Sequence, residues 1–368
     1  MPQLRLFAEL AGHDDRVWQV SWDKTGTRLA TCSGDKSARV WAPISGSSFF
    51  EQPGAPAPPT DAESPTTTAT WQCLDTIDNA HKRTVRSVCF APTSSDTLAT
   101  ASFDGTTAIW AKEEDDEYEC VATLEGHENE AKCVAWSPSG QLLATCGRDK
   151  SVWIWEASGE GDFDCISVLM EHTQDVKAVV WHPVHELLAS FSYDDTIRLW
   201  KDDEDDWYSA AVLSGHTSTV WGGAFSADGT YLASVSDDRT VRVWAQEKRE
   251  DAAQNDGFYY RPEVSYKCVT VVPDTVHSRA IYSVDWSAPV PGGASLGFVA
   301  TGCGDNSVRV FRAQQGNGDS VDLELTAETK NAHGLSDINC VQWNPQHPRW
   351  LATAGDDKVV RIWYLDLD

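Results

Sequence analysis

The feature that most constrains this chain is a pattern of four residue types that recurs seven times along it. Each repeat ends on an aromatic residue, namely Trp41, Trp110, Trp155, Trp200, Trp244, Phe311 or Trp363. Six residues earlier lies an aspartate, and four residues before the aspartate lies a serine or threonine. A histidine precedes each aromatic by 28 to 34 residues, at His13, His81, His127, His172, His216, His277 and His333. The chain is therefore built from seven copies of one unit, and only Phe311 departs from a tryptophan in this register.

Between these marker residues, short runs alternate or are β-branched, as in VWQVSW, RLATCS and SARVW. Such runs, joined by tight polar turns, predict four short antiparallel strands in each repeat. Where no insertion intervenes, the repeat spacing is about 44 or 45 residues, which is typical of WD-repeat propellers. We therefore expect an all-β fold, a seven-bladed WD40 β-propeller, in one domain over residues 1–368. Within each blade the His, Ser/Thr, Asp and Trp should form one hydrogen-bonded chain, because buried polar groups persist only when they are paired.

The two ends of the chain are expected to meet in one blade. Residues Leu4–Leu10 (LRLFAEL) precede the first histidine, where an outer strand belongs, and the last repeat ends at Trp363 without that strand. The N-terminal strand should therefore complete the last blade and close the ring, which leaves no long free edge. We expect flexible loop insertions at residues 42–70, which are rich in Pro, Ala and Thr, and at residues 246–265.

Composition argues against several classes of protein. The formal net charge is −27, so the chain should repel nucleic acid and anionic membranes. The first residues lack the apolar core of a signal peptide, and no run approaches the length of a membrane span, which favours a cytoplasmic location. The ten cysteines show no CxxC and no zinc-type spacing. We interpret them as small buried hydrophobes in strands, and we expect no metal, no cofactor and no bound cluster.

The repeated histidines and aspartates do not indicate an enzyme. Each is expected to be committed to the hydrogen-bonded chain of its own blade. The sequence contains no GxSxG, no P-loop, no HExxH and no Rossmann glycine fingerprint. We therefore expect no catalytic residue, and a role in protein–protein interaction.

The face that carries the turns before the first strand and after the second strand of each blade, here called the top face, has a chemistry of its own. Near the start of the innermost strands lie Trp18, Arg86, Lys132, Lys177, Trp221, Tyr282 and Asn339. Directly before the turn aspartates lie Gly34, Phe103, Arg148, Tyr193, Asp237, Gly304 and Asp356. Both sets should ring the mouth of the central channel. In these two sets the second to fourth repeats contribute cations and aromatics with no acid among them: Arg86, Phe103, Lys132, Arg148, Lys177 and Tyr193.

Arg148, in the stretch CGRDKSVWIW, is the only cation directly before a turn aspartate among the seven repeats. Two interpretations stay open: Arg148 pairs with a neighbouring acid such as Glu130 or Asp175, or it is an anchor for a partner. A guanidinium at a channel mouth suits a carboxylate, because two parallel hydrogen bonds match in geometry. Arginine and aromatic residues are also enriched as interface anchors. We expect a partner-binding role for Arg148, Arg86, Lys132, Lys177, Phe103, Tyr193, Trp18, Trp221 and Tyr282.

All seven repeats closely resemble the WD-repeat subunit of the cytosolic iron–sulfur protein assembly machinery. The resemblance is densest in GHENEAKCVAWSPSGQLLATCGRDKSVWIWE, in HTQDVKAVVWHPVHELLASFSYDDTIRLW, and in GHTSTVWGGAF followed by SDDRTVRVW. It implies a non-enzymatic scaffold of a targeting complex, which helps to deliver 4Fe–4S clusters to apoproteins of the cytosol and nucleus. The proline-rich insertion after Trp41 departs from the compact pattern of that family.

The resemblance also implies the partners. These are a small assembly partner, a large HEAT-repeat adaptor, an iron-only-hydrogenase-like carrier and client iron–sulfur apoproteins. Some clients are recognised by a C-terminal tail ending in an acidic residue and an aromatic, which is complementary to the basic and aromatic residues above. We expect the chain alone to be a monomer, in the cytoplasm and with the nucleus as a second location.

Two other classes of function stay open. One is a signalling or chromatin WD-repeat adaptor that binds a peptide on its top face, which the identity of copurifying proteins would distinguish. The other is an enzyme or a cluster-carrying protein, which an absorption spectrum of the purified chain would reveal.

Overall fold

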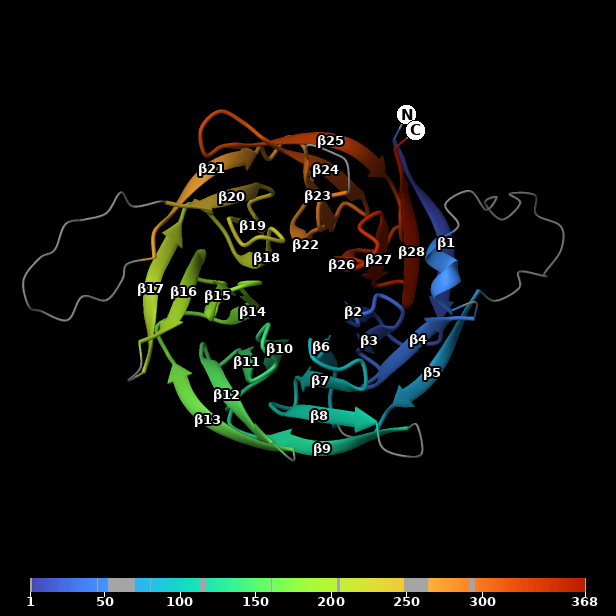
Figure 1. Cartoon of the computed structure of the whole chain (residues 1–368), viewed down its shortest axis with the longest axis vertical. Coiled ribbons are helices and arrows are strands. Elements are labelled where there is room, and N and C mark those ends of the chain that lie inside the picture. The colour runs from blue at the N-terminus through green and yellow to red at the C-terminus, as the bar shows by residue number, and fades with distance from the viewer. Residues whose placement is uncertain are drawn as a thin grey trace, which may run out of the picture.

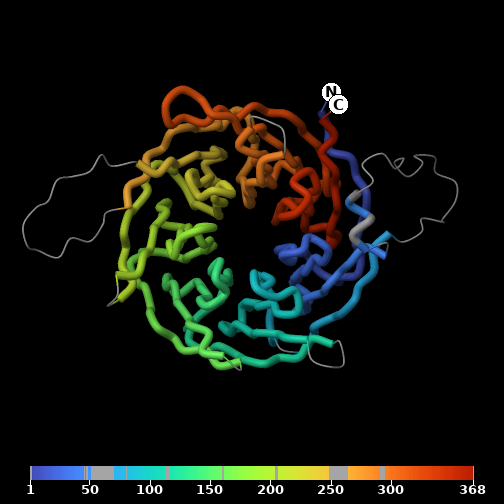
Figure 2. Tube along the Cα trace, in the orientation of Figure 1, coloured from blue at the N-terminus to red at the C-terminus, as the bar shows by residue number. Residues whose placement is uncertain are grey.

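The computed structural model describes residues 2–44, 46–51, 70–79, 81–112, 117–159, 161–203, 206–247, 264–290 and 295–367. In this part of the chain the fold is all-β apart from one 3-10 helix, η1 (Gly46–Glu51). Seven four-stranded antiparallel sheets stand as blades around a central channel (Figure 1), which confirms the predicted seven-bladed propeller. The blades follow one another around the ring in chain order (Figure 2). Among the described residues no helix is long and apolar enough to cross a membrane.

The blades are numbered in the chain order of their innermost strands, and the four strands of each blade are given from the innermost to the outermost. Blade 1 contains β2 (Val17–Trp22), β3 (Leu29–Ser33), β4 (Ala38–Pro43) and β5 (Trp71–Ile77); blade 2 contains β6 (Val85–Phe90), β7 (Thr97–Ser102), β8 (Thr107–Lys112) and β9 (Tyr118–Leu124); blade 3 contains β10 (Ala131–Trp136), β11 (Leu142–Gly147), β12 (Val152–Gly159) and β13 (Asp162–Leu169). Blade 4 contains β14 (Val176–Trp181), β15 (Leu187–Ser192), β16 (Thr196–Asp202) and β17 (Trp207–Ser214); blade 5 contains β18 (Val220–Phe225), β19 (Tyr231–Ser236), β20 (Val241–Gln246) and β21 (Tyr266–Val272); blade 6 contains β22 (Ile281–Trp286), β23 (Ser295–Cys303), β24 (Val308–Gln315) and β25 (Val321–Thr329). Blade 7 contains β26 (Ile338–Trp343), β27 (Trp350–Gly355), β28 (Val359–Asp366) and β1 (Gln3–Ala11).

The ring closes through blade 7, whose outer strand comes from the other end of the chain. Strand β1 pairs antiparallel with β28, and Leu6 lies opposite Trp363. The two termini lie side by side at this blade (Figure 1). The prediction that Leu4–Leu10 completes the last blade is therefore confirmed, and closure removes the free edge that an open ring would expose.

The apolar core lies between neighbouring blades rather than within one of them. Val40 of blade 1, for example, packs in one cluster with Val85 and Val88 of blade 2. Every residue of the second strands β11, β15, β19 and β27 is buried, because both faces of a middle strand are covered by adjacent blades. The outer strand β9 is mostly exposed between its buried ends.

Nine of the ten cysteines lie in these two environments, and Cys89 is only partly buried. Cys32, Cys133, Cys146, Cys303 and Cys340 are buried, as predicted. The prediction is wrong for the four cysteines of the outer strands, which are exposed: Cys73, Cys120, Cys165 and Cys268. They share a repeat position, and that position faces solvent because the outer strand has only one covered face.

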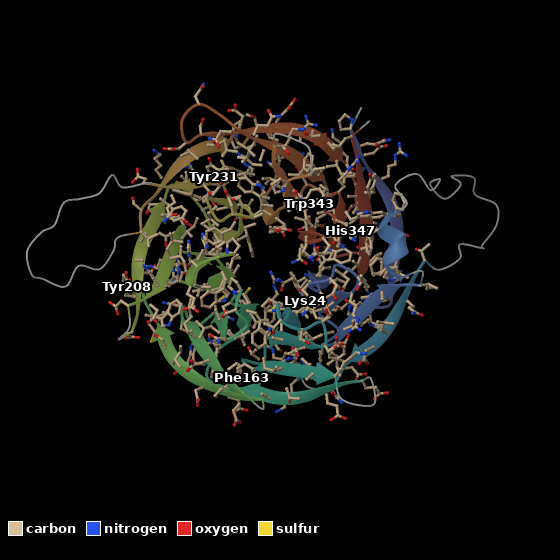
Figure 3. The ribbon with its side chains drawn as sticks, in the orientation of Figure 1. Lys24, Phe163, Tyr208, Tyr231, Trp343 and His347 are labelled. Carbon is tan, nitrogen blue, oxygen red and sulfur yellow. The ribbon has the colours of Figure 1, made fainter. Side chains whose placement is uncertain are left out.

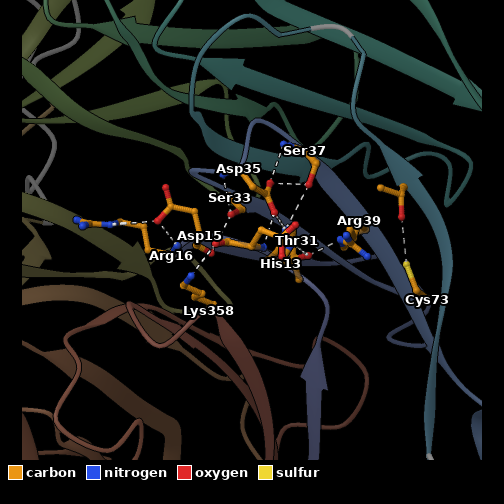
Figure 4. Close-up of polar contacts among 12 residues, drawn as sticks. His13, Asp15, Arg16, Thr31, Ser33, Asp35, Ser37, Arg39, Cys73 and Lys358 are labelled. Atoms are coloured by element: carbon orange, nitrogen blue, oxygen red, sulfur yellow. Dashed lines mark hydrogen bonds and ion pairs between the residues drawn. The ribbon is translucent and has the colours of Figure 1, made fainter.

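The predicted hydrogen-bonded chain is present in six blades, and blade 1 illustrates it (Figure 4). His13 Nδ1 lies 2.8 Å from Asp35 Oδ2, and His13 Nε2 lies 2.8 Å from Thr31 Oγ1. The indole N–H of Trp41 donates to the same Thr31 oxygen at 2.9 Å. Burial alone would raise the pKa of Asp35, but hydrogen bonds from His13 and Ser37 hold it below its usual value. These bonds tie β3, β4 and the turn between them to the loop that precedes the blade.

Blade 6 departs from this arrangement, and the prediction of a complete chain is wrong there. His277 Nε2 reaches Thr301 Oγ1 at 3.0 Å, but His277 Nδ1 is buried without a hydrogen-bond partner. Asp305 instead pairs with Arg309 at 3.0 Å, and Phe311 has no indole N–H to donate. Burial and the Arg309 charge lower the pKa of His277 to about 4, so this imidazole is neutral at physiological pH.

The predicted insertion at residues 42–70 begins with a packed segment. In η1, Phe50 is buried, and its ring lies 4.9 Å from the His347 ring in a stacked arrangement. Phe49 packs at 5.1 Å from the Trp350 ring, and β5 resumes at Trp71. Residues 52–69 and 248–263, which make up most of the two predicted loops, lie outside the described residues.

Candidate functional site

The predicted inner set of top-face residues lies at seven β-bulges. The register of β10 with β11 shifts between Ala131 and Cys133, so Lys132 has no partner in the ladder. The same shift occurs around Trp18, Arg86, Lys177, Trp221, Tyr282 and Asn339. A bulged residue is left unpaired and its side chain is re-aimed. All seven side chains line one cavity of about 330 Å³ at the channel, as the sequence predicted, although the bulges themselves were not foreseen.

Aromatic rings contact two of the cations in this inner set, Arg86 and Lys177. The Arg86 guanidinium lies 4.7 Å from the centre of the Trp18 ring. The Lys177 ammonium lies 4.9 Å from the Tyr193 ring and 5.1 Å from the Trp221 ring. Such contacts are worth about 0.5–2 kcal/mol, depending on desolvation. They orient the positive charges toward the channel mouth without neutralising them.

Two acids lie among the predicted cations. Asp175 Oδ2 accepts from Lys132 Nζ at 2.5 Å and lies 3.7 Å from Lys177 Nζ. Glu130 accepts from Arg83 Nη2 at 2.8 Å. The two sequence sets contained neither acid, because each lies one residue before the start of an innermost strand. These two acids therefore compensate part of the positive charge at the channel mouth.

Burial changes the charge balance at Lys177. Its side chain is only 11% exposed. Burial and the neighbouring Lys132 charge lower the pKa of Lys177 to about 8, although the charge of Asp175 opposes this shift. Burial therefore makes the Lys177 ammonium easier to neutralise than an exposed lysine.

The predicted outer set lies beside the cavity rather than in it. Arg148 is the most accessible cation of the patch, with 58% of its side chain exposed, and its Nη1 lies 3.7 Å from Glu130 Oε2. Tyr193 is half exposed and packs on Lys177. Phe103 lies under the guanidinium of Arg83, 5.9 Å from it. Of the two partners considered for Arg148, the structure places Glu130 nearer, but the contact is long and leaves most of the guanidinium open to solvent.

We call Arg86, Phe103, Lys132, Arg148, Lys177 and Tyr193 the basic patch, and Trp18, Trp221 and Tyr282 its aromatic border. The border rings are themselves in contact, since Trp221 and Tyr282 meet edge to face at 5.1 Å. Arg83, which the sequence sets omitted, belongs to the same surface through Phe103 and Glu130. Among the described residues no three His, Cys, Asp or Glu side chains gather in a way that could hold a metal ion.

Comparison with known proteins agrees with this architecture. The family described as "WD domain, G-beta repeat" matches residues 4–42, 71–111, 118–156, 163–201, 207–245 and 326–364. The repeat left unmatched is the one that ends at Phe311 and carries the incomplete hydrogen-bonded chain.

Several curated relatives match over nearly their whole length. A Kluyveromyces lactis protein named "Probable cytosolic iron-sulfur protein assembly protein 1" is 40% identical over 100% of this chain and 99% of its own. A Culex quinquefasciatus protein named "Probable cytosolic iron-sulfur protein assembly protein Ciao1" is 42% identical over 100% of both chains. The chain belongs to this family of cytosolic iron–sulfur protein assembly proteins. A plant member of the family, "Protein CIA1" of Arabidopsis thaliana, is 45% identical over 97% of this chain and 95% of its own.

Proposed function

We propose that this chain is a non-enzymatic scaffold of cytosolic iron–sulfur protein assembly. The observation that carries the proposal is the full-length identity of about two residues in five to relatives named as assembly proteins of that kind. A propeller suits such a role because its blades form a rigid ring that can hold several partners at once. The iron–sulfur cluster is the cargo of the assembly, and we propose that this chain binds no cluster stably by itself.

We further propose that the basic patch and its aromatic border contact a protein partner. Arg148 supports this role because its guanidinium is largely solvent-exposed and its nearest acid, Glu130, already accepts from Arg83. A partner carboxylate can therefore reach Arg148 without first breaking a strong ion pair. The net charge of −27 makes a local basic patch selective for acidic groups by contrast with the rest of the surface.

The partners that we propose follow from the family. They are a small assembly partner, a HEAT-repeat adaptor, an iron-only-hydrogenase-like carrier and client apoproteins that receive 4Fe–4S clusters. The printed names of the relatives include the word cytosolic, which supports a cytoplasmic location, and we propose the nucleus as a second location because some clients act there.

Affinity purification of the tagged chain from its native cell tests this function. We expect iron–sulfur assembly factors and iron–sulfur apoproteins among the copurifying proteins. Recovery of histones or signalling proteins alone would instead favour an adaptor of another kind. Anaerobic reconstitution followed by visible absorption tests the cluster separately, and a stoichiometric thiolate-to-iron band lost on mutating particular cysteines would contradict the proposal that the chain carries none.

A further inference from the structure

Side chains of the innermost strands join neighbouring blades across the channel wall. Ser87 of blade 2 accepts a hydrogen bond from the amide of Val134 in blade 3 at 3.1 Å. Ser283 of blade 6 accepts from the amide of Val341 in blade 7 at 3.0 Å. In each case the hydroxyl of the third residue of one innermost strand accepts from the backbone amide of the fourth residue of the next innermost strand. In three seams the side chain of the fifth residue likewise accepts from the amide of the sixth residue in the next blade. Ser21 accepts from Phe90, Asp285 from Trp343, and Gln342 from Trp22.

Whereas the seam between blades 3 and 4 lacks a side-chain acceptor only at Ala135, two neighbouring seams, between blades 4 and 5 and between blades 5 and 6, have none at either position. The residues at the accepting positions there are Ala178 and Val180 of β14 and Gly222 and Ala224 of β18, none of which has a side-chain acceptor. We call these two the open seams. The amides that face them by position are those of Gly223, Phe225, Val284 and Trp286, and within the described residues no side chain of the preceding blade accepts from them.

The ladder register supports this orientation. Gly223 lies opposite Ser234 just as Val88 lies opposite Thr100 in blade 2. The Val88 amide points out of its blade, to Gln19 at 3.0 Å. In an antiparallel ladder, residues at equivalent register positions direct their amides to the same side. The amide of Gly223 is therefore a donor directed at the channel wall.

The open seams line the cavity that the basic patch borders. Ala178, Gly222 and Val284 all belong to the lining of the 330 Å³ cavity. A second cavity of about 580 Å³ continues the channel toward the bottom face, and both cavities are lined by Asp285 and Val180. Trp343 and Lys24 of the second cavity lie near the channel, whereas Tyr208 and Phe163 lie at the outer rim (Figure 3). The amides at the open seams line these two cavities and have no side-chain acceptor in the preceding blade, so they can donate hydrogen bonds to a segment bound in the channel.

The spacing of these amides and the positive charge at the top of the cavity indicate what kind of molecule binds there. Gly223 and Phe225 are two residues apart on one strand, so their amides are about 6.6–6.8 Å apart, which matches the acceptor spacing of an added extended strand. Arg86, Lys132 and Lys177 line the top of the same cavity, and Asp175 compensates only part of this positive charge. We infer that the open seams bind an extended, acidic peptide segment of a partner protein, whose carbonyls accept from the channel-wall amides and whose carboxylates meet the cations at the mouth.

The position of Asp285 determines which part of the bound segment stays at the top of the channel. Asp285 lies where the two cavities join and holds its carboxyl against the amide of Trp343 at 2.7 Å. A carboxylate at that depth would repel acidic side chains of the guest. The acidic residues of the segment therefore stay at the top, near Lys132 and Lys177, and only its backbone and small side chains reach as far as Asp285.

The chain offers a variant that closes an open seam. Gly222→Ser places a hydroxyl where Ser283 has one in the next blade, so it should accept from the Val284 amide and remove that donor from the guest. A β-carbon at Gly222 would meet only Ala178 Cβ, at 3.8 Å, which is ordinary contact. Gly222→Ala adds the same β-carbon without an acceptor and is the matched steric control. Neither change touches Arg148, so a failure of this inference is distinguishable from a failure of the proposed function.

The probe is a blocked octapeptide of alternating Glu and Thr, with the alternating Lys and Thr peptide and inositol hexakisphosphate as comparisons. We expect saturable binding of the acidic peptide alone, slower hydrogen exchange of the Gly223, Phe225 and Val284 amides, and about tenfold weaker binding by Gly222→Ser. Gly222→Ala should bind within about twofold of the unmodified chain, a difference that corresponds to less than half a kcal/mol.

Several results would overturn the inference. These are absence of acidic-peptide binding, equal binding of the lysine peptide, unchanged exchange at the open seams, or equal losses in the serine and alanine variants. Binding of inositol hexakisphosphate with the same sensitivity to Gly222→Ser would also overturn it, since the site would then take a small polyanion rather than a peptide strand.

Discussion

Reversing the charge of Arg148 separates a recognition role from a structural one. Six sister repeats fold with Gly, Phe, Tyr or Asp at this position, so the turn does not require a cation. In the structure the side chain is 58% exposed and its nearest acidic oxygen, on Glu130, is 3.7 Å away. Arg148→Glu therefore removes one weak surface ion pair and places a second carboxylate near Glu130.

The expected magnitudes differ widely between folding and binding. An exposed pair of this length is worth at most about 1 kcal/mol, and the Glu130 carboxylate keeps its 2.8 Å bond to Arg83. The free energy of unfolding should therefore fall by no more than about 1 kcal/mol. If Arg148 meets a buried partner carboxylate, the binding free energy should weaken by about 2–5 kcal/mol. Arg148→Lys should recover only part of this loss, because an ammonium cannot reproduce two parallel hydrogen bonds.

The assay is a titration of each purified partner against the chain, with a denaturant unfolding curve for every variant. Lys112→Glu and Lys201→Glu are the controls. Each residue directly precedes an acidic stretch, residues 113–117 and 202–206, away from the basic patch, and both variants should bind normally. The reasoning would be refuted if Arg148→Glu bound every partner with unchanged affinity, or if it lost binding only because it no longer folded.

Three further perturbations test the fold. Asp194→Ala should lower the free energy of unfolding by about 2–4 kcal/mol in a denaturant titration. The reason is that the buried His172 loses the carboxylate that lies 2.8 Å from its Nδ1. The pKa of Asp194 is lowered in the folded state, by hydrogen bonds from His172 and Thr196 that outweigh burial, so this stability is present above about pH 4 and is lost as the pH falls through the folded value. Burial raises the pKa of Asp285 to about 6, so its contribution falls as the pH rises from about 4 to 6; Asp285→Asn should raise stability at pH 7 by about 1–2 kcal/mol and flatten that dependence. Deleting β1 should unfold blade 7 and remove the cooperative thermal transition, whereas a transition unchanged in midpoint would contradict ring closure through β1.

The repeat register made the fold predictable from the sequence. The His, Ser/Thr, Asp and aromatic positions specified the number of blades, and the missing outer strand after Trp363 specified how Leu4–Leu10 closes the ring. The inner ring of the candidate site was predictable for the same reason, because residues such as Arg86 and Lys177 occupy one repeat position. Equivalent positions in a propeller are equivalent in space.

Departures from the repeat were harder to predict, because they depend on side-chain partners in neighbouring loops. Asp175 compensates Lys132 from a turn that belonged to neither sequence set. In blade 6, the Asp305 carboxylate pairs with Arg309 and not with His277, the partner that the repeat register predicted. Phe311 was the visible sign that this repeat differs, but an aromatic substitution alone does not specify which acid–base pair is broken.

The most direct test of the assembly role is a measurement in the native cell. The chain is depleted, and radioactive iron incorporation is followed in one cytosolic iron–sulfur enzyme and in one mitochondrial iron–sulfur enzyme. A scaffold of cytosolic assembly predicts that incorporation falls in the cytosolic enzyme alone and returns when the unmodified chain is supplied. Unchanged incorporation in the cytosolic enzyme, with the chain verifiably absent, would contradict the proposed function.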